Sequence, residues 1–585
     1  MKTRFLIALL CAALSLATSA RADSDFKANQ LFSDHMVLQN GMTVPVWGTA
    51  TAGERVTVKI AGQTKSVVTG ADGKWMVKLS QLKSGGPYTM SISGKKAHSP
   101  LVINLVNDVL VGEVWLGSGQ SNMVFNVSNT GHRPYGLLDE KQEIAAANYP
   151  QVRMFTVADT KSFAPLAEPK GEWKVCSPET VADFSAIGYL FARNLNQALK
   201  EPVGIILSAY GASTAEAWVP REALAADPKL KPVLDGFDAR VAAFKAQPPA
   251  PATPAADAQA PPVAATLVNP TAGLGPAPTA GTGAPAAGAP PPARRARGGG
   301  GDPVQDQHQP TVLYNGMINP VIPYAIRGAI WYQGESILGN PGIPMYAHVM
   351  ETLVTTWRQL WGEGDFPFYA VQLAALKNNS NNPRVREQQA EILSVKNTGL
   401  AVAVDIGDSA NVHPKNKEAL CDRLSRIALA NVYGKKMEFS GPVYAGMKVE
   451  GDAIRISFTH AQGLTTHYPE GLYAHVASPP NAASTAEVPA ANDGPLKWFQ
   501  IAGADGKYVD AQATIDASTV VVKSPDVPAP VSVRYAWDNY PYGANLYNAA
   551  GLPAVPFRTN KMDEPAAATP APRPAATAPA QPNGE

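Results

Sequence analysis

The chain has 585 residues and a formal net charge of +1, from 49 basic and 48 acidic side chains. Because one hydrophobic core rarely extends over such a length, about two or three domains are expected. The balanced charge excludes the strong single-sign field that favours nucleic acid or a membrane surface, so an acidic substrate would need a local cluster of Arg or Lys.

The first 22 residues have the pattern of a secretory signal peptide. A basic start and the apolar run 5–17 are followed by Ala20-Arg21-Ala22, which fits cleavage before Asp23. No other apolar run is long enough to span a membrane. We therefore expect a periplasmic or secreted protein whose two remaining thiols, Cys176 and Cys421, could form one disulfide.

Residues 23–107 contain short runs of alternating or β-branched residues, separated by Asp-Gly and Gly-Gly turns. Strands at this spacing predict a small β-sandwich. No cluster of titratable side chains stands out in this region, so support of another domain is favoured over contact with a glycan. The expected strands cover residues 44–47, 56–60, 74–79, 88–92 and 101–105.

From residue 108 to 437 the pattern changes to strands that alternate with helices. This alternation predicts an α/β domain with a parallel sheet flanked by helices, and ligands of such sheets gather at the carboxyl ends of the strands. The expected strands are 109–115, 152–157, 203–209, 326–332, 366–372 and 400–405, and the expected helices are 184–199, 346–360 and 416–432.

Two segments lack the apolar residues that a packed core needs. Residues 247–309 are rich in Pro, Ala and Gly, and the tail 561–585 has a similar composition. Both are expected to be disordered. Between them, residues 438–560 predict a β-rich region, with strands at 453–458, 497–501, 519–523 and 531–536.

A serine follows the first strand of the α/β region, in Gly117-Ser118-Gly119-Gln120-Ser121-Asn122-Met123. The two glycines allow tight or positive-φ backbone, which would present Ser121 at the edge of the sheet. Ser121 could be a nucleophile, although an ordinary helix N-cap explains the same residues equally well. Met123 excludes the Gly-x-Ser-x-Gly elbow of the larger hydrolase fold.

Two further strand ends carry polar candidates. Gly211 follows the strand 203–209 at an expected helix start, where its amide could donate to an oxyanion, although an ordinary turn is the simpler interpretation. Gln333 follows the strand 326–332 and could donate from its side-chain amide. Glu335 could orient Gln333 or the substrate, and helix capping is as probable a role for it.

His413 is the only one of the nine histidines that lies in a loop between a strand end and a helix. Asp405 and Asp408 precede it, and a base followed by an orienting carboxylate is what a serine nucleophile needs. Ser409 lies in a Gly-Asp-Ser string that imitates a nucleophile motif. Its closeness to His413 leaves no room for a substrate carbonyl, so we discount it.

Three blocks of this chain resemble the signature blocks of the sialate O-acetylesterase family, within the SGNH (GDSL-like) hydrolases. They are residues 119–123, 331–336 and 411–417, and the segments 31–39, 210–218 and 545–553 resemble that family too. The resemblance covers most of residues 30–560. It implies an SGNH-type hydrolase core with a β-sandwich-like region before it and a β-rich region after it.

The resemblance also implies a mechanism. Ser121 would attack an acetyl ester and His413 would take its proton, while the N–H groups of Ser121 and Gly211 and the side chain of Gln333 hold the oxyanion. An acetyl-enzyme would form and water would release acetate. Asn122 and Glu335 are placed by the resemblance among the oxyanion and substrate contacts.

The acid of the triad departs from the pattern. Many SGNH enzymes carry Asp three residues before the histidine, and this position is Ala410 here. Asp408 is the first choice for orienting His413 and Asp405 is the second. A backbone carbonyl that serves a Ser-His dyad is the third.

The resemblance implies no metal or cofactor, and it implies an O-acetylated sugar or glycan as substrate. O-acetylated sialic acid is the first choice and acetylated xylan or another polysaccharide is the alternative, while a non-catalytic glycan-binding protein is the alternative from another class. A sialate carboxylate would favour a nearby arginine, for which Arg133 and Arg327 are candidates. The sequence indicates no oligomeric state.

Overall fold

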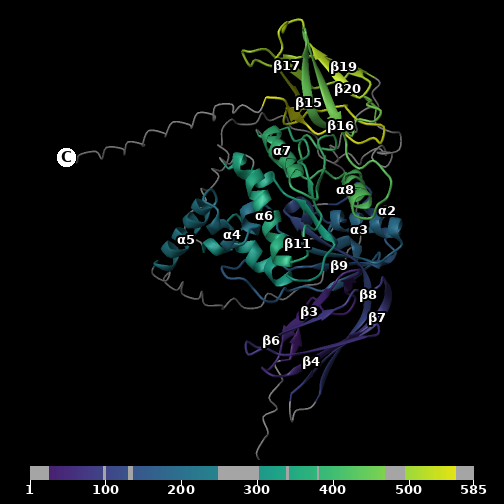
Figure 1. The fold of residues 1–585 in the computed structure, drawn as a ribbon, viewed down its shortest axis with the longest axis vertical. Coiled ribbons are helices and arrows are strands. Elements are labelled where there is room, and N and C mark those ends of the chain that lie inside the picture. Colours follow the sequence, from purple (N-terminus) through teal and green to yellow (C-terminus); the bar gives the residue numbers. More distant parts are fainter. Residues whose placement is uncertain are drawn as a thin grey trace, which may run out of the picture.

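The computed structural model describes residues 26–96, 101–129, 136–247, 302–337, 342–377, 381–467 and 494–560. The predicted signal peptide and tail, and residues 248–301 of the predicted insertion, lie outside these ranges. Along the long axis of the molecule, a β-rich region lies at each end and a helix-flanked sheet lies between them (Figure 1). The predicted fold class is therefore confirmed.

The central sheet is built around strand β8, which runs from Val102 to Gly119. β8 and five other strands of this sheet are parallel, and β10 is antiparallel at one edge. Their continuous burial fits a parallel sheet that is covered on both faces. In spatial order the strands are β10 (Trp173–Cys176), β9 (Tyr149–Thr156), β11 (Val203–Ala209), β8, β12 (Gly328–Tyr332), β13 (Phe368–Val371) and β14 (Thr398–Ala401).

Two tryptophans show how helices cover both faces of this sheet. Trp331 of β12 is in register with Ser118 of β8, three residues after Trp115, so the two indoles point to opposite faces. Trp115 packs on Phe191 of α3 with ring centroids 5.1 Å apart. Trp331 packs on Trp357 of α6 with centroids 6.1 Å apart. Figure 1 shows α3 and α8 on one side of the sheet and α4, α5 and α6 on the other.

The predicted long helices begin at polar caps or end at left-handed residues. Ser185 accepts a hydrogen bond from Gly188 N–H at the start of α3, and Asn416 accepts one from Ala419 N–H at the start of α8. Gly362 ends α6 in the left-handed conformation. The α-helices are α1 (Ser121–Val124), α2 (Glu140–Ala146), α3 (Ala186–Leu199), α4 (Arg221–Ala226), α5 (Lys231–Lys245), α6 (Tyr346–Trp361), α7 (Asn382–Ala390) and α8 (Lys417–Asn431). Short helical turns are η1 (Val181–Asp183), η2 (Ala215–Trp218), η3 (Pro303–Gln305), η4 (Tyr314–Ile318), η5 (Asn319–Val321), η6 (Glu335–Ile337), η7 (Ile343–Met345) and η8 (Glu391–Ser394).

The amino-terminal region consists of two sheets, and one of them shares strand β8 with the central sheet. β1, β3 and β6 form one sheet. In the other sheet, β7 pairs with the first half of β8, β4 pairs with β7, and β5 pairs with β4. The predicted boundary at residue 107 therefore falls inside a continuous strand. The strands of the amino-terminal region before β8 are β1 (Lys27–Ala28), β2 (Val37–Gln39), β3 (Val44–Thr49), β4 (Arg55–Ile60), β5 (Gln63–Val68), β6 (Lys74–Leu79) and β7 (Gly85–Lys95).

The carboxyl-terminal β-rich region has a hydrophobic core of its own, built on residues such as Ile454, Ile501 and Val520. It joins the central domain through Arg558, whose guanidinium pairs with Glu387 at 2.8 Å. Two four-stranded sheets make up the region. They contain β15 (Val443–Glu450), β16 (Ala453–Thr459), β17 (Phe499–Ala502), β18 (Val509–Asp510), β19 (Gln512–Asp516), β20 (Thr519–Lys523), β21 (Ser532–Tyr535) and β22 (Phe557–Arg558).

Two expectations from the sequence are corrected. The predicted insertion is too long at its end, because residues 302–309 include η3 and Gln309 accepts a hydrogen bond from Arg240. The disulfide that the sequence allowed is not formed, since Cys176 and Cys421 are buried free thiols. Within the described ranges, no helix is long and apolar enough to cross a membrane.

Gly119 is the glycine on which the end of β8 depends. Its φ is +133°, and a Cβ added there would lie 2.1 Å from the Tyr332 carbonyl oxygen. We predict that Gly119→Ala lowers the free energy of unfolding by about 3 kcal/mol or more, from backbone strain together with overpacking. Gly62→Ala is the control, because its φ is +77° and a Cβ there meets nothing within 4 Å. It should cost about 1 kcal/mol in urea unfolding, and equal losses would contradict the prediction.

Candidate active site

Ser121 lies where β8 ends against β12. The Gln120 N–H donates to the Tyr332 carbonyl at 2.9 Å, and helix α1 begins at the next residue. The close approach that Gly119 permits therefore fixes the position of Ser121 at the carboxyl edge of the sheet. The sequence predicted this turn correctly.

His413 meets Ser121 from the loop between β14 and α8. Its Nε2 lies 2.8 Å from Ser121 Oγ, although the two residues are 292 positions apart in sequence. The Asn411 side chain accepts a hydrogen bond from the His413 backbone N–H at 2.9 Å, which fixes the backbone of the loop. A hydroxyl within hydrogen-bond reach of an imidazole is the arrangement of an activated nucleophile and its base.

The surroundings of His413 favour the neutral imidazole. Burial lowers the pKa of His413 to about 4, and the positive charge of Lys417 contributes in the same direction. A neutral imidazole can accept a proton, so His413 is in the form that a general base requires at neutral pH.

The two candidate carboxylates have different surroundings. Asp405 is buried and forms an ion pair with Arg423 at 2.7 Å, and the Tyr547 hydroxyl donates to it at 3.1 Å. Asp408 Oδ1 accepts hydrogen bonds from the N–H groups of Ala410 and Asn411, at 2.9 and 3.0 Å. Asp408 thus shapes the loop that carries His413, whereas Asp405 is part of a buried ionic contact.

Gly211 and Ser121 follow neighbouring parallel strands at the same edge of the sheet. Tyr210 N–H donates to the Gly119 carbonyl at 3.0 Å, which joins the ends of β11 and β8 just before these two residues. Among the described residues, neither the Ser121 N–H nor the Gly211 N–H donates to a protein acceptor. The pair is free to donate to a developing negative charge.

Gln333 is fully buried beneath this site. Its amide nitrogen donates to the Ser213 carbonyl at 3.0 Å, and its amide oxygen accepts from the Tyr346 hydroxyl at 2.8 Å. The side chain therefore joins the loop after β11 to helix α6. Donation from Gln333 to an oxyanion stays a prediction.

Asn122 and Glu335 are linked through Lys417. The Lys417 ammonium donates to Asn122 Oδ1 at 2.6 Å, and the Asn122 amide donates to Glu335 Oε1. Sequence reasoning missed Lys417, although a helical signal was present. Lys417 lies three and seven residues before Leu420 and Leu424, which places it on the same core face of α8.

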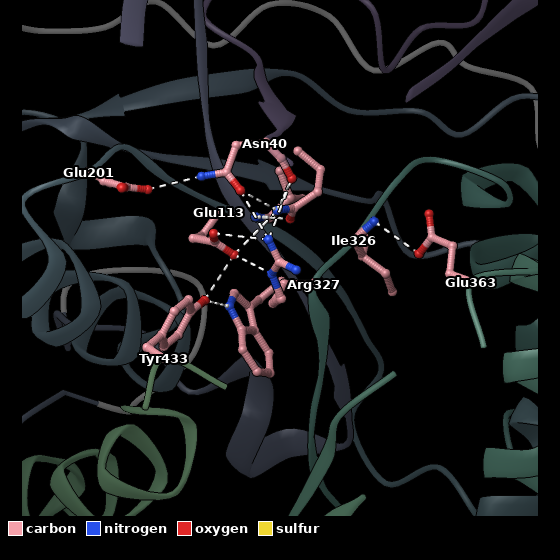
Figure 2. A network of polar contacts seen from close by, with 10 residues as sticks. Asn40, Glu113, Glu201, Ile326, Arg327, Glu363 and Tyr433 are labelled. Atoms are coloured by element: carbon pink, nitrogen blue, oxygen red, sulfur yellow. Dashed lines mark hydrogen bonds and ion pairs between the residues drawn. The ribbon is translucent and has the colours of Figure 1, made fainter. Parts of the chain in front are cut away.

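Arg327 is not at this site. It precedes β12 and therefore lies at the amino end of the sheet, where its guanidinium contacts Glu113 at 2.7 and 3.2 Å and the side chain of Asn40 at 3.0 Å (Figure 2). The Tyr433 hydroxyl donates to Glu113 in the same network. The expectation that Arg327 could meet a substrate carboxylate is wrong, and Arg133 lies outside the described residues.

The described part of the chain contains no group of three or more His, Cys, Asp or Glu side chains that could hold a metal ion.

Similarity to known proteins agrees with this geometry. The family model described as a carbohydrate esterase, sialic acid-specific acetylesterase, matches residues 296–430. Sialate O-acetylesterases from Rattus norvegicus and Homo sapiens are 27% and 24% identical, over 94% and 93% of this chain and 97% and 94% of theirs. A carbohydrate acetylesterase from Xanthomonas citri superposes with a TM-score of 0.69 and 29% identity, covering 92% of this chain and 100% of that one.

The chain resembles the sialate O-acetylesterases along nearly its whole length. It is therefore a carboxylic ester hydrolase, and the prediction of an enzyme is confirmed. The family model spans Gln333, Glu335 and His413, whereas Ser121 and Gly211 lie before it. The candidate site is thus assembled from segments on both sides of residues 248–301.

Asp405 and Asp408 should differ in what they control. We predict that Asp405→Asn lowers the free energy of unfolding by about 3–5 kcal/mol, because it leaves the buried Arg423 charge without its partner. Asp408→Asn keeps an oxygen for the two loop amides and removes only the charge, so it should lower turnover with little effect on the unfolding midpoint. Thermal unfolding and ester hydrolysis of both variants test this. The reverse pattern would refute the assignment.

Proposed function

We propose that this esterase removes acetyl groups from sugar hydroxyls, with Ser121 as the nucleophile and His413 as the general base. The observation that carries the proposal is the 2.8 Å contact between Ser121 Oγ and His413 Nε2 at the carboxyl edge of the parallel sheet. Ligands of such sheets bind at that edge. Similarity to sialate O-acetylesterases supports the reaction class.

The reaction has two halves. Ser121 Oγ attacks the acetyl carbonyl carbon while its proton passes to His413 Nε2, and the oxyanion that forms accepts from the N–H groups of Ser121 and Gly211. His413 then returns the proton to the sugar oxygen, which leaves the acetyl group on Ser121. Water attacks this ester with His413 as base, and acetate departs. In enzymes of this type, removal of one oxyanion donor raises the activation barrier by about 2.7–4 kcal/mol.

The names of similar proteins indicate the class of sugar substrate. The family description and the names of the curated relatives favour O-acetylated sialic acid. The Xanthomonas citri structure supports an acetylated carbohydrate in general, which keeps acetylated xylan or another polysaccharide as the alternative. The signal-peptide pattern supports export to the periplasm or the medium.

We predict that Ser121→Ala abolishes acetate release from p-nitrophenyl acetate, because it removes the only atom that forms the acetyl-enzyme. Ser409→Ala is the matched control, since this serine lies in the same loop as His413 and takes no part in the proposed reaction. It should retain the wild-type rate. Equal rates for wild type and Ser121→Ala would end the proposal.

The substrate can be decided by comparing acetate release from O-acetylated sialic acid with release from acetylated xylan, using the Ser121→Ala variant as the blank for each. We expect the higher kcat/KM for the sialate. A higher value for xylan would indicate a polysaccharide substrate and would leave the assignment of Ser121 and His413 unchanged.

The activity should persist in acid. Protonation of His413 removes the base, so activity is lost as the pH falls through its pKa, which burial and Lys417 lower to about 4. We predict an acidic limb of kcat/KM near pH 4, measured with p-nitrophenyl acetate in buffers of constant ionic strength. A limb near pH 6.5 would show that the imidazole keeps its ordinary pKa.

A further inference from the structure

A lysine ammonium lies buried directly behind the catalytic serine and histidine. The Lys417 side chain is fully buried, and its Nζ lies 4.6 Å from the ring centre of Phe125 and 5.2 Å from that of Tyr332. The aromatic faces attract the cation, but burial of a charge still needs a hydrogen-bond acceptor. That acceptor is Asn122 Oδ1, at 2.6 Å.

The same asparagine joins the two catalytic segments. Its amide nitrogen donates to the Val412 carbonyl at 3.0 Å and to Glu335 Oε1. Asn122 follows Ser121, and Val412 precedes His413. One side chain therefore links the helix that carries the nucleophile to the loop that carries the base, and its orientation depends on Lys417 on one side and Glu335 on the other.

Glu335 is the counter-ion of this arrangement. Burial raises its pKa, and the hydrogen bond from Asn122 and the charge of Lys417 oppose that rise. Burial in turn lowers the pKa of Lys417 to about 7, and Glu335 opposes this shift. Each charge thus favours the ionised form of the other across the Asn122 amide, because a buried ion without a partner is costly.

We propose that Lys417, acting through Asn122, is a positioning residue that holds Ser121 and His413 in reacting geometry, with Glu335 as its buried counter-ion. The inference rests on the proposed function, since it concerns the same serine and histidine. It assigns to Lys417 a part in the reaction without contact to the substrate.

A pH signature follows from the charges that surround His413. Lys417 from α8, Glu335 from η6 and Asp408 from its own loop are the ionisable groups, while Asp405 is paired with Arg423. Lys417 is protonated below its pKa of about 7, which includes the range in which His413 titrates. Its charge opposes protonation of the imidazole, so its removal raises the pKa of His413.

The variant Lys417→Met keeps the length of the side chain and removes the charge. We expect kcat to fall by about 10²-fold and KM to change less. A small displacement of the reacting groups has an effect of this size on kcat. The acidic limb of kcat/KM should move up by about one pH unit. Lys415→Met is the control, because it removes a charge from the same loop two residues away, and it should change neither quantity.

The double variant Lys417→Met with Glu335→Gln guards against misfolding, since it removes both buried charges and leaves neither without a partner. We expect its unfolding midpoint to lie above that of Lys417→Met, while its acidic limb stays shifted and its kcat stays low. A purely structural role predicts instead that kcat recovers together with the unfolding midpoint. That outcome, or a wild-type acidic limb in the double variant, would overturn the inference.

A readout that needs no turnover separates this inference from the proposed function. NMR titration of ¹³C-labelled histidine, assigned with His413→Gln, should show the higher His413 pKa in the double variant. If the wild type lacks esterase activity that depends on Ser121, the proposed function fails. If the His413 pKa is the same in both proteins, the inference fails, whatever the esterase assay gives.

Discussion

The contact between the end of β8 and the end of β12 is the constraint on which the site depends. Gln120 N–H donates to the Tyr332 carbonyl, and Gly119 allows the two backbones to approach so closely that a Cβ would not fit. Ser121 follows at once in α1. Because β8 also pairs with the amino-terminal sheet, one strand leads to the proposed nucleophile and joins two regions of the molecule.

Buried ionic contacts lie at opposite ends of this sheet and serve different purposes. At the amino end, Glu113 and Arg327 tie β8 to the residues before β12, with Asn40 of the amino-terminal region in the same network (Figure 2). At the carboxyl end, Lys417 and Glu335 are bridged by the Asn122 amide. The first contact joins regions of the fold, and the second lies between the segments that carry the nucleophile and the base.

Periodicity in the sequence predicted most of the central sheet, because buried strands and amphipathic helices leave local patterns. It also placed Ser121 and His413 at strand ends, and the family resemblance paired them. Sequence periodicity missed β5, an edge strand with mostly exposed residues. It could not foresee that Gln333 would be held by Ser213, 120 positions away, since side-chain partners depend on tertiary packing. Arg327 was misjudged because a residue before a parallel strand lies at the end opposite to the ligand.

The low pKa of His413 has a consequence for the chemistry. An imidazole that resists protonation is ready to accept a proton, but the imidazolium that forms during the attack is then less stable. The charge of Lys417 adds to this cost. A carboxylate or carbonyl at the other ring nitrogen would therefore contribute more here than in a site without a buried cation.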